Sequence, residues 1–165
     1  MCPYKSLRLH AGAAGLIALL CFAAGVIAGN VFHLAACPLC ILQRMLYLAA
    51  AIIGILAGWL WYRMPARVLN LLFCTLCATG VWVSAYQSYL QRHPTKGGCS
   101  ADSPWWENFV YWAGDHYPAL FMSNGMCTDP GFKLLGLSIA EYSLMMFLAL
   151  TLLGFYILLR GKHSR

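Results

Sequence analysis

Long runs of apolar residues without a single charge set the pattern of this chain. Four such runs cover residues 11–29, 45–62, 68–86 and 142–159, and each is 18 or 19 residues long. Because a helix rises about 1.5 Å per residue, each run is long enough to cross most of a hydrocarbon core of about 30 Å. The pattern therefore predicts four transmembrane helices.

The composition agrees with a chain that is solvated by lipid. Of the 165 residues, 61% are hydrophobic and only 10% are charged, which is atypical of a soluble globular domain. One charged residue at the middle of the bilayer costs roughly 2.5 to 3.5 kcal/mol on the insertion scale, which explains why all four runs exclude charge. We expect an all-α integral membrane four-helix bundle that forms one membrane domain over residues 1–165.

The positions of the charged residues predict the orientation of the bundle. The net charge of +6 arises from basic residues near the helix ends, not from one basic face, which favours a topological signal over nucleic-acid binding. With the N-terminus inside, the inner side carries seven basic and no acidic residues, and the outer side carries four basic and all five acidic residues. The positive-inside rule then makes both termini cytoplasmic, with a long outer loop at about 90–141 between the third and fourth helices.

One part of this outer loop has the pattern of a short amphipathic helix. Ser103 is a plausible N-cap and Pro104 a first helical residue. Trp105, Phe109 and Trp112 follow at helical spacing on one face. Two interpretations stay open: a helix lying at the membrane interface, or an aromatic face that covers the top of the bundle.

The eight cysteines divide by their predicted topological positions. Cys2 is cytoplasmic, and Cys21, Cys74 and Cys77 fall near the middles of spans, where a thiol acts as a small apolar side chain. The outer side holds four cysteines: Cys37, Cys40, Cys99 and Cys127. Of their three possible pairings, the most economical joins Cys37 with Cys40 and Cys99 with Cys127.

Cys74 and Cys77 also have the CxxC spacing, but they lie inside a continuous span and are interpreted as packing thiols. We predict no metal site.

The Cys37-Pro38-Leu39-Cys40 motif lies at the outer mouth of the second helix. Two thiols at this spacing form a small ring that opens and closes easily, and a helix N-terminus favours the thiolate of a nearby cysteine. Arg44 follows Cys40 by four residues, so it lies on the same helix face one turn deeper. Its side chain could stabilise a thiolate or hydrogen-bond a quinone carbonyl. The alternative is that Arg44 has no role in the chemistry and only extends its side chain to the aqueous interface.

These residues resemble the DsbB family of membrane thiol:quinone oxidoreductases. The resemblance covers the chain from the first span to the last. It rests on Cys37-Pro-Leu-Cys-Ile-Leu-Gln-Arg44, on Leu90-Gln91, on Ser123-Asn-Gly-Met-Cys127 and on Leu135-Gly-Leu-Ser-Ile139. A CxxC motif alone is a weak signal, whereas CxxC with the arginine and a second outer pair is a specific combination.

The resemblance implies a path for electrons. A DsbA-like thioredoxin-fold protein of the periplasm would be reoxidised through Cys99 and Cys127, with Cys99 forming the mixed disulfide. Cys127 would then exchange with Cys37, and Cys40 would donate to a membrane quinone, ubiquinone or menaquinone, beside Arg44. The resemblance also implies a location in the bacterial inner membrane with the active site on the periplasmic side, and a role in disulfide bond formation.

The chain departs from the family pattern in the third helix and before the fourth. Gln87 stands where many members have a histidine, and Ala140 and Tyr142 replace a proline and a tryptophan. Gln87 can still hydrogen-bond a quinone, but it cannot change its charge near neutral pH. We therefore assign Arg44 and Gln87 as candidate quinone-binding residues.

Two other functions stay open from the residues alone. The first is a thiol reductase of the vitamin-K-epoxide-reductase type, or a quinol-linked one, in which electrons flow in the opposite direction. The second is a non-catalytic membrane scaffold in which both outer disulfides are structural. The scaffold leaves Arg44 and the short ring of Cys37 and Cys40 without an explanation.

Overall fold

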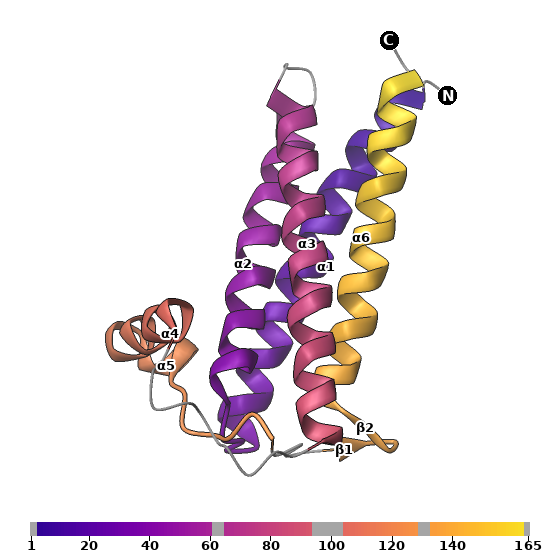
Figure 1. Cartoon of the computed structure of the whole chain (residues 1–165). Helices are drawn as coiled ribbons and strands as arrows, with labels where there is room; N and C mark the ends of the chain where they lie inside the picture. Colours follow the sequence, from indigo (N-terminus) through magenta and orange to yellow (C-terminus); the bar gives the residue numbers. More distant parts are fainter. Residues whose placement is uncertain (1–2, 61–64, 94–103, 129–132, 164–165) are drawn as a thin grey trace.

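A computed structural model describes most of the chain, namely residues 3–60, 65–93, 104–128 and 133–163. Four long helices form a bundle: α1 (Pro3–Val31), α2 (Pro38–Trp59), α3 (Pro65–Arg92) and α6 (Ile139–His163). Each is long and apolar enough to cross a membrane. α1 begins and α6 ends at the same end of the bundle, and the shorter elements gather at the other end, which we call the loop end (Figure 1). The predicted all-α four-helix membrane fold is confirmed.

The helices extend beyond most limits of the charge-free runs. α2 begins at Pro38, well before the run that starts at residue 45, and α3 continues to Arg92, inside the segment predicted as the outer loop. The absence of charge marks the depth of the hydrocarbon and not the length of the helix, because charged side chains on terminal turns can reach water. The predicted end of the second span at residue 62 lies outside the described residues, and α2 itself ends at Trp59.

Small residues allow α1 and α2 to pack closely. A Cβ atom on Gly15 would lie 2.5 Å from the backbone nitrogen of Ile55, and one on Gly58 would lie 2.9 Å from the Cα of Gly12. In a membrane the hydrophobic effect does not drive helices together, because lipid tails are as apolar as the side chains. Close van der Waals packing of the backbones at small residues stabilises the helix pair instead. α1 is therefore held firmly against the helix that begins with the Cys37 motif.

A short hairpin leads into α6 at the loop end. Its strands β1 (Lys133–Leu134) and β2 (Leu137–Ser138) pair antiparallel. The two turn residues between them, Leu135 and Gly136, have φ angles of 51° and 84°. A two-residue turn with both φ angles positive matches the right-handed twist of a hairpin.

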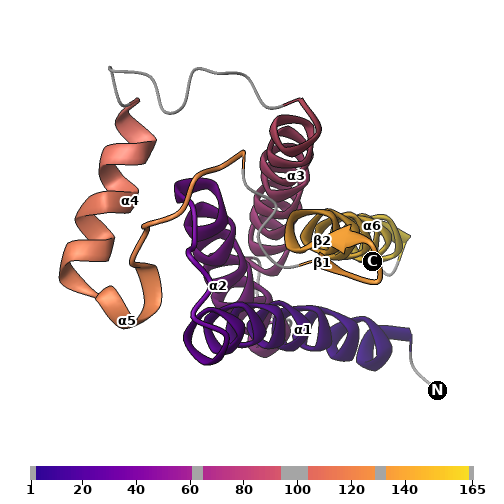
Figure 2. The same cartoon turned by 90° about the horizontal axis from the view of Figure 1, so that it is seen from below.

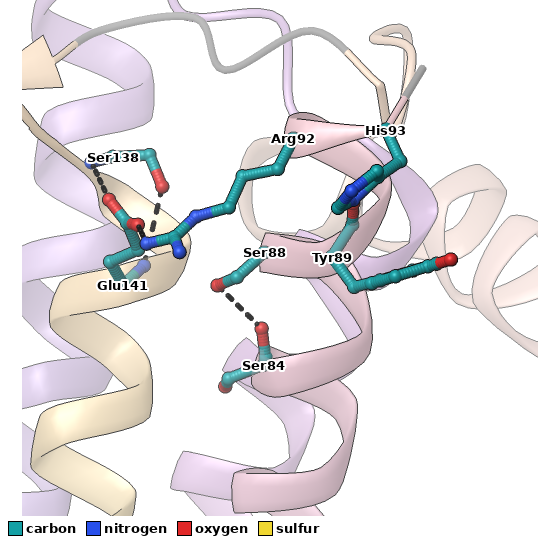
Figure 3. Close-up of polar contacts among 7 residues, drawn as sticks. All are labelled: Ser84, Ser88, Tyr89, Arg92, His93, Ser138 and Glu141. Atoms are coloured by element: carbon teal, nitrogen blue, oxygen red, sulfur yellow. Dashed lines mark hydrogen bonds and ion pairs between the residues drawn. The ribbon is translucent and has the colours of Figure 1, made fainter. Parts of the chain in front are cut away.

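The hairpin ends in a capping box that fastens α6 to α3 (Figure 3). The Ser138 backbone nitrogen donates to Oε2 of Glu141 at 2.9 Å, and the Glu141 nitrogen donates to Oγ of Ser138 at 3.4 Å. Arg92, at the end of α3, pairs with the same carboxylate. The ends of α3 and α6 are thereby joined beside the site described below.

The segment predicted as the outer loop contains α4 (Trp105–His116) and α5 (Pro118–Phe121), which lie beside α2 on the side away from α6 (Figure 2). Pro104 is the N-cap, with ψ of 156°, so the prediction of Pro104 as the first helical residue is wrong by one position. Extended ψ is the usual conformation of an N-cap and excludes Pro104 from the helix itself. Ser103, the predicted N-cap, lies outside the described residues.

The three aromatic residues of the predicted amphipathic face of α4 point away from the bundle. Trp105, Phe109 and Trp112 are 81%, 51% and 54% exposed, whereas Val110 and Ala113 on the opposite face are buried. This buried face packs with residues at the start of α2. The interpretation that this aromatic face covers the top of the bundle is therefore wrong, because Trp106, Val110 and Ala113 make that contact instead. A position of the aromatic face at the membrane interface stays a prediction.

Candidate active site

The chain makes a sharp turn between α1 and α2 that places Cys37. The Leu34 nitrogen donates to the Gly29 carbonyl at 3.1 Å, and His33 between them has a φ angle of 49°, as in a Schellman motif. Cys37 follows in an extended conformation as the N-cap of α2, and its sulfur accepts a hydrogen bond from the Cys40 nitrogen at 3.3 Å. The thiol takes the position that a serine or aspartate oxygen holds in other helices.

Three thiols meet at this helix N-terminus. The sulfurs of Cys37 and Cys40 lie 3.1 Å apart as free thiols. Cys127 lies beside Cys37, and their side chains are hydrogen-bonded. The structure thus brings a cysteine of the segment between α3 and α6 to the CxxC pair, although Cys127 lies 90 residues after Cys37 in the chain.

A backbone clamp holds the Cys127 segment against the chain before Cys37. The nitrogens of Asn124 and Gly125 both donate to the Ala36 carbonyl at 3.0 Å. A Cβ atom on Gly125 would lie 2.8 Å from the carbonyl carbon of Ala35, so only glycine fits this approach. The clamp fixes Cys127 over Cys37 through backbone contacts that sequence patterns do not reveal.

The two thiols outside the spans differ in acidity. Hydrogen bonding with Cys127 and with Cys40, together with burial, raises the pKa of Cys37. The hydrogen bond with Cys37 lowers the pKa of Cys127. The expected effect of the helix N-terminus at Cys37 is therefore outweighed by the neighbouring sulfurs. When all three thiols are reduced, Cys127 is therefore the more acidic of the two, and Cys37 is the sulfur next to it.

Two buried amides complete the surroundings of the sulfurs. Gln87 of α3 donates from Nε2 to the sulfur of Cys40 at 2.9 Å and to that of Cys37 at 3.3 Å. Gln43 of α2 donates from Nε2 to Oε1 of Gln87 at 2.7 Å. The sequence singled out Gln87 as a quinone ligand, and the structure places it against the thiols. Gln43 was missed as a site residue, although an amide within the apolar turns of α2 was a signal for it.

Arg44 lies between α1 and α5 and does not point freely into solvent. Its Nη1 donates to the Leu120 carbonyl at 3.3 Å. A Cβ atom on Gly29 would lie 2.7 Å from its Nη2, so the glycine leaves room for the guanidinium. This position, one turn from Cys40, does not fit the alternative of an interfacial arginine that only reaches for water.

A cavity of about 420 Å³ opens beside these residues. Its walls include Cys37, Cys40, Arg44 and Gln87, and much of the remaining lining is apolar, from Ala24 and Ala28 of α1 to Met146 of α6. Volumes of about 300 to 1,000 Å³ with a few convergent polar groups are typical of small-molecule sites. Five of the six predicted site residues therefore lie together, and the sixth, Cys99, lies outside the described residues.

A membrane four-helix bundle with three thiols gathered beside such a cavity defines a membrane thiol oxidoreductase. The chain matches the model of the family described as Disulfide bond formation protein DsbB over residues 7–157. Disulfide bond formation protein B of Dechloromonas aromatica is 35% identical over 153 residues, which cover 89% of each chain. The protein of the same name from Cupriavidus metallidurans is 36% identical over 136 residues, or 81% of each chain.

A third relative, Disulfide bond formation protein B of Nitrosomonas europaea, is 31% identical over 159 residues, which cover 84% of this chain and 87% of the relative. The chain belongs to the DsbB family of disulfide bond formation proteins. It is a membrane oxidoreductase that acts in disulfide bond formation.

Proposed function

We propose that this protein reoxidises a DsbA-like thiol oxidase of the periplasm and passes the electrons to a membrane quinone. Electrons enter at the Cys99 and Cys127 pair and continue to the Cys37 and Cys40 pair. In this proposal the loop end faces the periplasm and both termini are cytoplasmic, in the inner membrane of a bacterium. The charge distribution supports this orientation, because the cytoplasmic side then carries the excess of basic residues.

One observation carries the proposal. Cys127 contacts Cys37, Cys37 contacts Cys40, and Cys40 lines the cavity together with Arg44. The three sulfurs form a continuous path from the outer segment to the cavity. In a scaffold with structural disulfides, by contrast, the two cysteine pairs would not need to be in contact.

The thiol exchanges balance in both electrons and protons. The partner dithiol reduces the Cys99–Cys127 disulfide, and the Cys127 thiolate then attacks Cys37 of the Cys37–Cys40 disulfide. A Cys37–Cys127 bond forms and the Cys40 thiolate leaves. Cys99 attacks Cys127, which restores the first disulfide and releases Cys37, so two electrons and two protons now belong to the inner pair. The contact between Cys127 and Cys37 places the attacking sulfur beside the sulfur that it attacks.

The residues around the cavity fit a quinone. Its apolar walls suit a quinone ring and tail, and the Arg44 guanidinium can hydrogen-bond a carbonyl oxygen. Arg44 also stabilises negative charge on the Cys40 sulfur one turn away. Gln87 lines the same cavity, and its amide nitrogen donates to the two sulfurs there. A quinone held there, ubiquinone or menaquinone, would supply the acceptor for the two electrons and two protons of the Cys37 and Cys40 pair.

The test supplies the purified protein with a reduced thioredoxin-fold partner and a soluble ubiquinone or menaquinone analogue. We expect one partner disulfide for each quinol formed, followed by the quinone absorbance and by thiol titration. The Cys99→Ser/Cys127→Ser variant is the matched control. It should stop oxidation of the partner, while quinone still reoxidises a chemically reduced Cys37 and Cys40 pair.

Three results would contradict the proposal. Absence of quinone reduction in a folded preparation would favour the alternative interpretation that the protein is a non-catalytic scaffold. Faster reduction of an oxidised partner by quinol would establish the opposite direction of flow. Undiminished partner turnover in the double-serine control would show that the relay does not need the outer pair.

A further inference from the structure

Two carboxamides lie where hydrophobic residues are expected. Gln43 of α2 is 4% exposed and Gln87 of α3 is 1% exposed, and both lie within spans. A buried amide without hydrogen bonds costs free energy, so each must be satisfied by its neighbours. The neighbours are the other amide and the sulfurs of the CxxC pair.

The hydrogen bonds between the amides determine which end of Gln87 meets the sulfurs. Gln43 donates to Oε1 of Gln87, so the oxygen of Gln87 is already engaged. The NH₂ group at the other end of the same planar amide must then face Cys40 and Cys37. A donor that points at a sulfur stabilises the thiolate more than the thiol, because the hydrogen bond is stronger when the acceptor is charged.

We propose that Gln87 is a catalytic residue that stabilises the Cys40 thiolate, and that Gln43 is a positioning residue that acts through Gln87 by holding its NH₂ group toward the sulfur. This inference rests on the proposed function, in which Cys40 leaves as a thiolate before it passes electrons on. Among the described residues no hydrogen bond joins Gln43 to either sulfur, so its contribution depends on Gln87 being present.

The amide pair acts among other groups that affect the same sulfur. Cys37 and Cys127 approach from the chain before α2 and from the outer segment, and Arg44 lies one turn along α2. Cys21 of α1 and Tyr142 of α6 line the cavity that Cys40 faces. Unlike the thiols, the two amides keep the same donors at every pH from acid to alkaline, so they displace the titration of Cys40 without adding one of their own.

The test measures the reactivity of Cys40 without quinone and without a partner protein. Fully reduced protein is alkylated with iodoacetamide at a series of pH values, and the modification of Cys40 is followed by peptide mass spectrometry. Alkylation at high pH reports how easily the reagent reaches the sulfur, and the midpoint of the profile reports the stability of the thiolate. Access and thiolate stability are thereby separated.

The test variants replace each glutamine with methionine, whose side chain has nearly the same length but carries no hydrogen-bond donor. We expect Gln87→Met to slow alkylation of Cys40 at pH 7 by about ten- to a hundredfold, the effect of losing one hydrogen bond to a charged group. Gln43→Met should produce most of that loss. The double variant should match Gln87→Met alone, because a residue that acts through another adds nothing once the other is gone.

Ser88→Ala is the matched control, because Ser88 follows Gln87 on α3 and bonds only within its own helix, to the Ser84 carbonyl at 2.9 Å (Figure 3). It should leave the alkylation profile unchanged. If Gln43→Met fails to insert, Gln43→Ala takes its place. An unchanged profile in Gln87→Met would overturn the inference, and so would losses that add in the double variant.

The outcomes for the amides and for the proposed function can be told apart. If the profile does not move but quinone is reduced, the inference fails and the function stands. If quinone is not reduced but the profile moves as expected, the amide pair is established and the acceptor has to be sought elsewhere.

Discussion

Two CxxC motifs in this chain have the same spacing and very different surroundings. Cys37 caps the N-terminus of α2, and its sulfur contacts those of Cys40 and Cys127. Cys74 and Cys77 lie inside the uninterrupted helix α3, remote from either of its ends. In the first pair the backbone nitrogens of a helix start point at a sulfur, whereas in the second they are already used within the helix.

The second pair takes part in the packing of α3, where the Cys74 thiol also donates a hydrogen bond. The Cys74 sulfur lies 3.8 Å from the Thr151 carbonyl, and a Cβ atom on Gly154 would lie 2.8 Å from that sulfur. Cys77 is fully buried in the cluster that contains Phe73 and Phe147. The comparison shows that spacing alone does not make a redox centre. A helix N-terminus, an adjacent amide donor and access to a cavity do.

The largest expected effect separates the two pairs directly. Cys37→Ser/Cys40→Ser should reduce quinone reduction to the uncatalysed background, because no dithiol remains beside the cavity. Partner-dependent quinone reduction in membranes checks this. Retention of turnover with an intact fold would mean that electrons reach the quinone by another route, such as Cys74 and Cys77.

Arg44 distinguishes the first pair further, since the second has no cation one turn away on its own helix. Arg44→Met should lower kcat/KM for quinone by about ten- to a hundredfold, or 1.5 to 3 kcal/mol, the value of a hydrogen bond to a charged group. Arg44→Lys keeps the charge but loses the planar fork, so it should mainly raise KM. Equal kinetics for wild type and Arg44→Met would remove Arg44 from the site.

Gly125 tests the clamp that brings Cys127 to the first pair. In Gly125→Ala the new methyl group meets the Ala35 backbone, so the segment must shift, at a cost of about 1 to 3 kcal/mol. We expect partner turnover to slow by roughly tenfold while quinone still reoxidises a chemically reduced Cys37 and Cys40 pair at the wild-type rate. Gly161→Ala, where a Cβ atom meets nothing within 4 Å, is the control. A slowing of both reactions would indicate general damage.

The smallest effect is expected for the remaining cysteines. Alanine at Cys2, Cys21, Cys74 and Cys77 together should change kcat by less than about twofold, because the thiols in the spans act as small apolar groups. Thermal stability should fall modestly, since Cys77 leaves a small void. Complete inactivity in a folded variant would contradict the division of the cysteines by topology.

Much of the site could be predicted because its elements are local in the chain. The pair Cys37 and Cys40, and Arg44 one turn further, follow from spacing on one helix. The contact of Cys127 with Cys37 was expected only through the resemblance to a family, since no spacing rule connects residues so far apart. The role of Gln43 was missed, because its partner Gln87 lies on another helix.

The sequence by itself determined that the chain spans a membrane four times, because exclusion of charge over 18 or 19 residues is a requirement of the lipid and holds for each segment separately. It also predicted which cysteines share one side of the membrane. Only the tertiary structure decided that Gln87 faces the sulfurs, that Gly125 clamps Cys127 in place and that Arg44 borders a cavity. These contacts depend on how α1, α2 and α3 pack, and packing brings together residues that no local pattern relates.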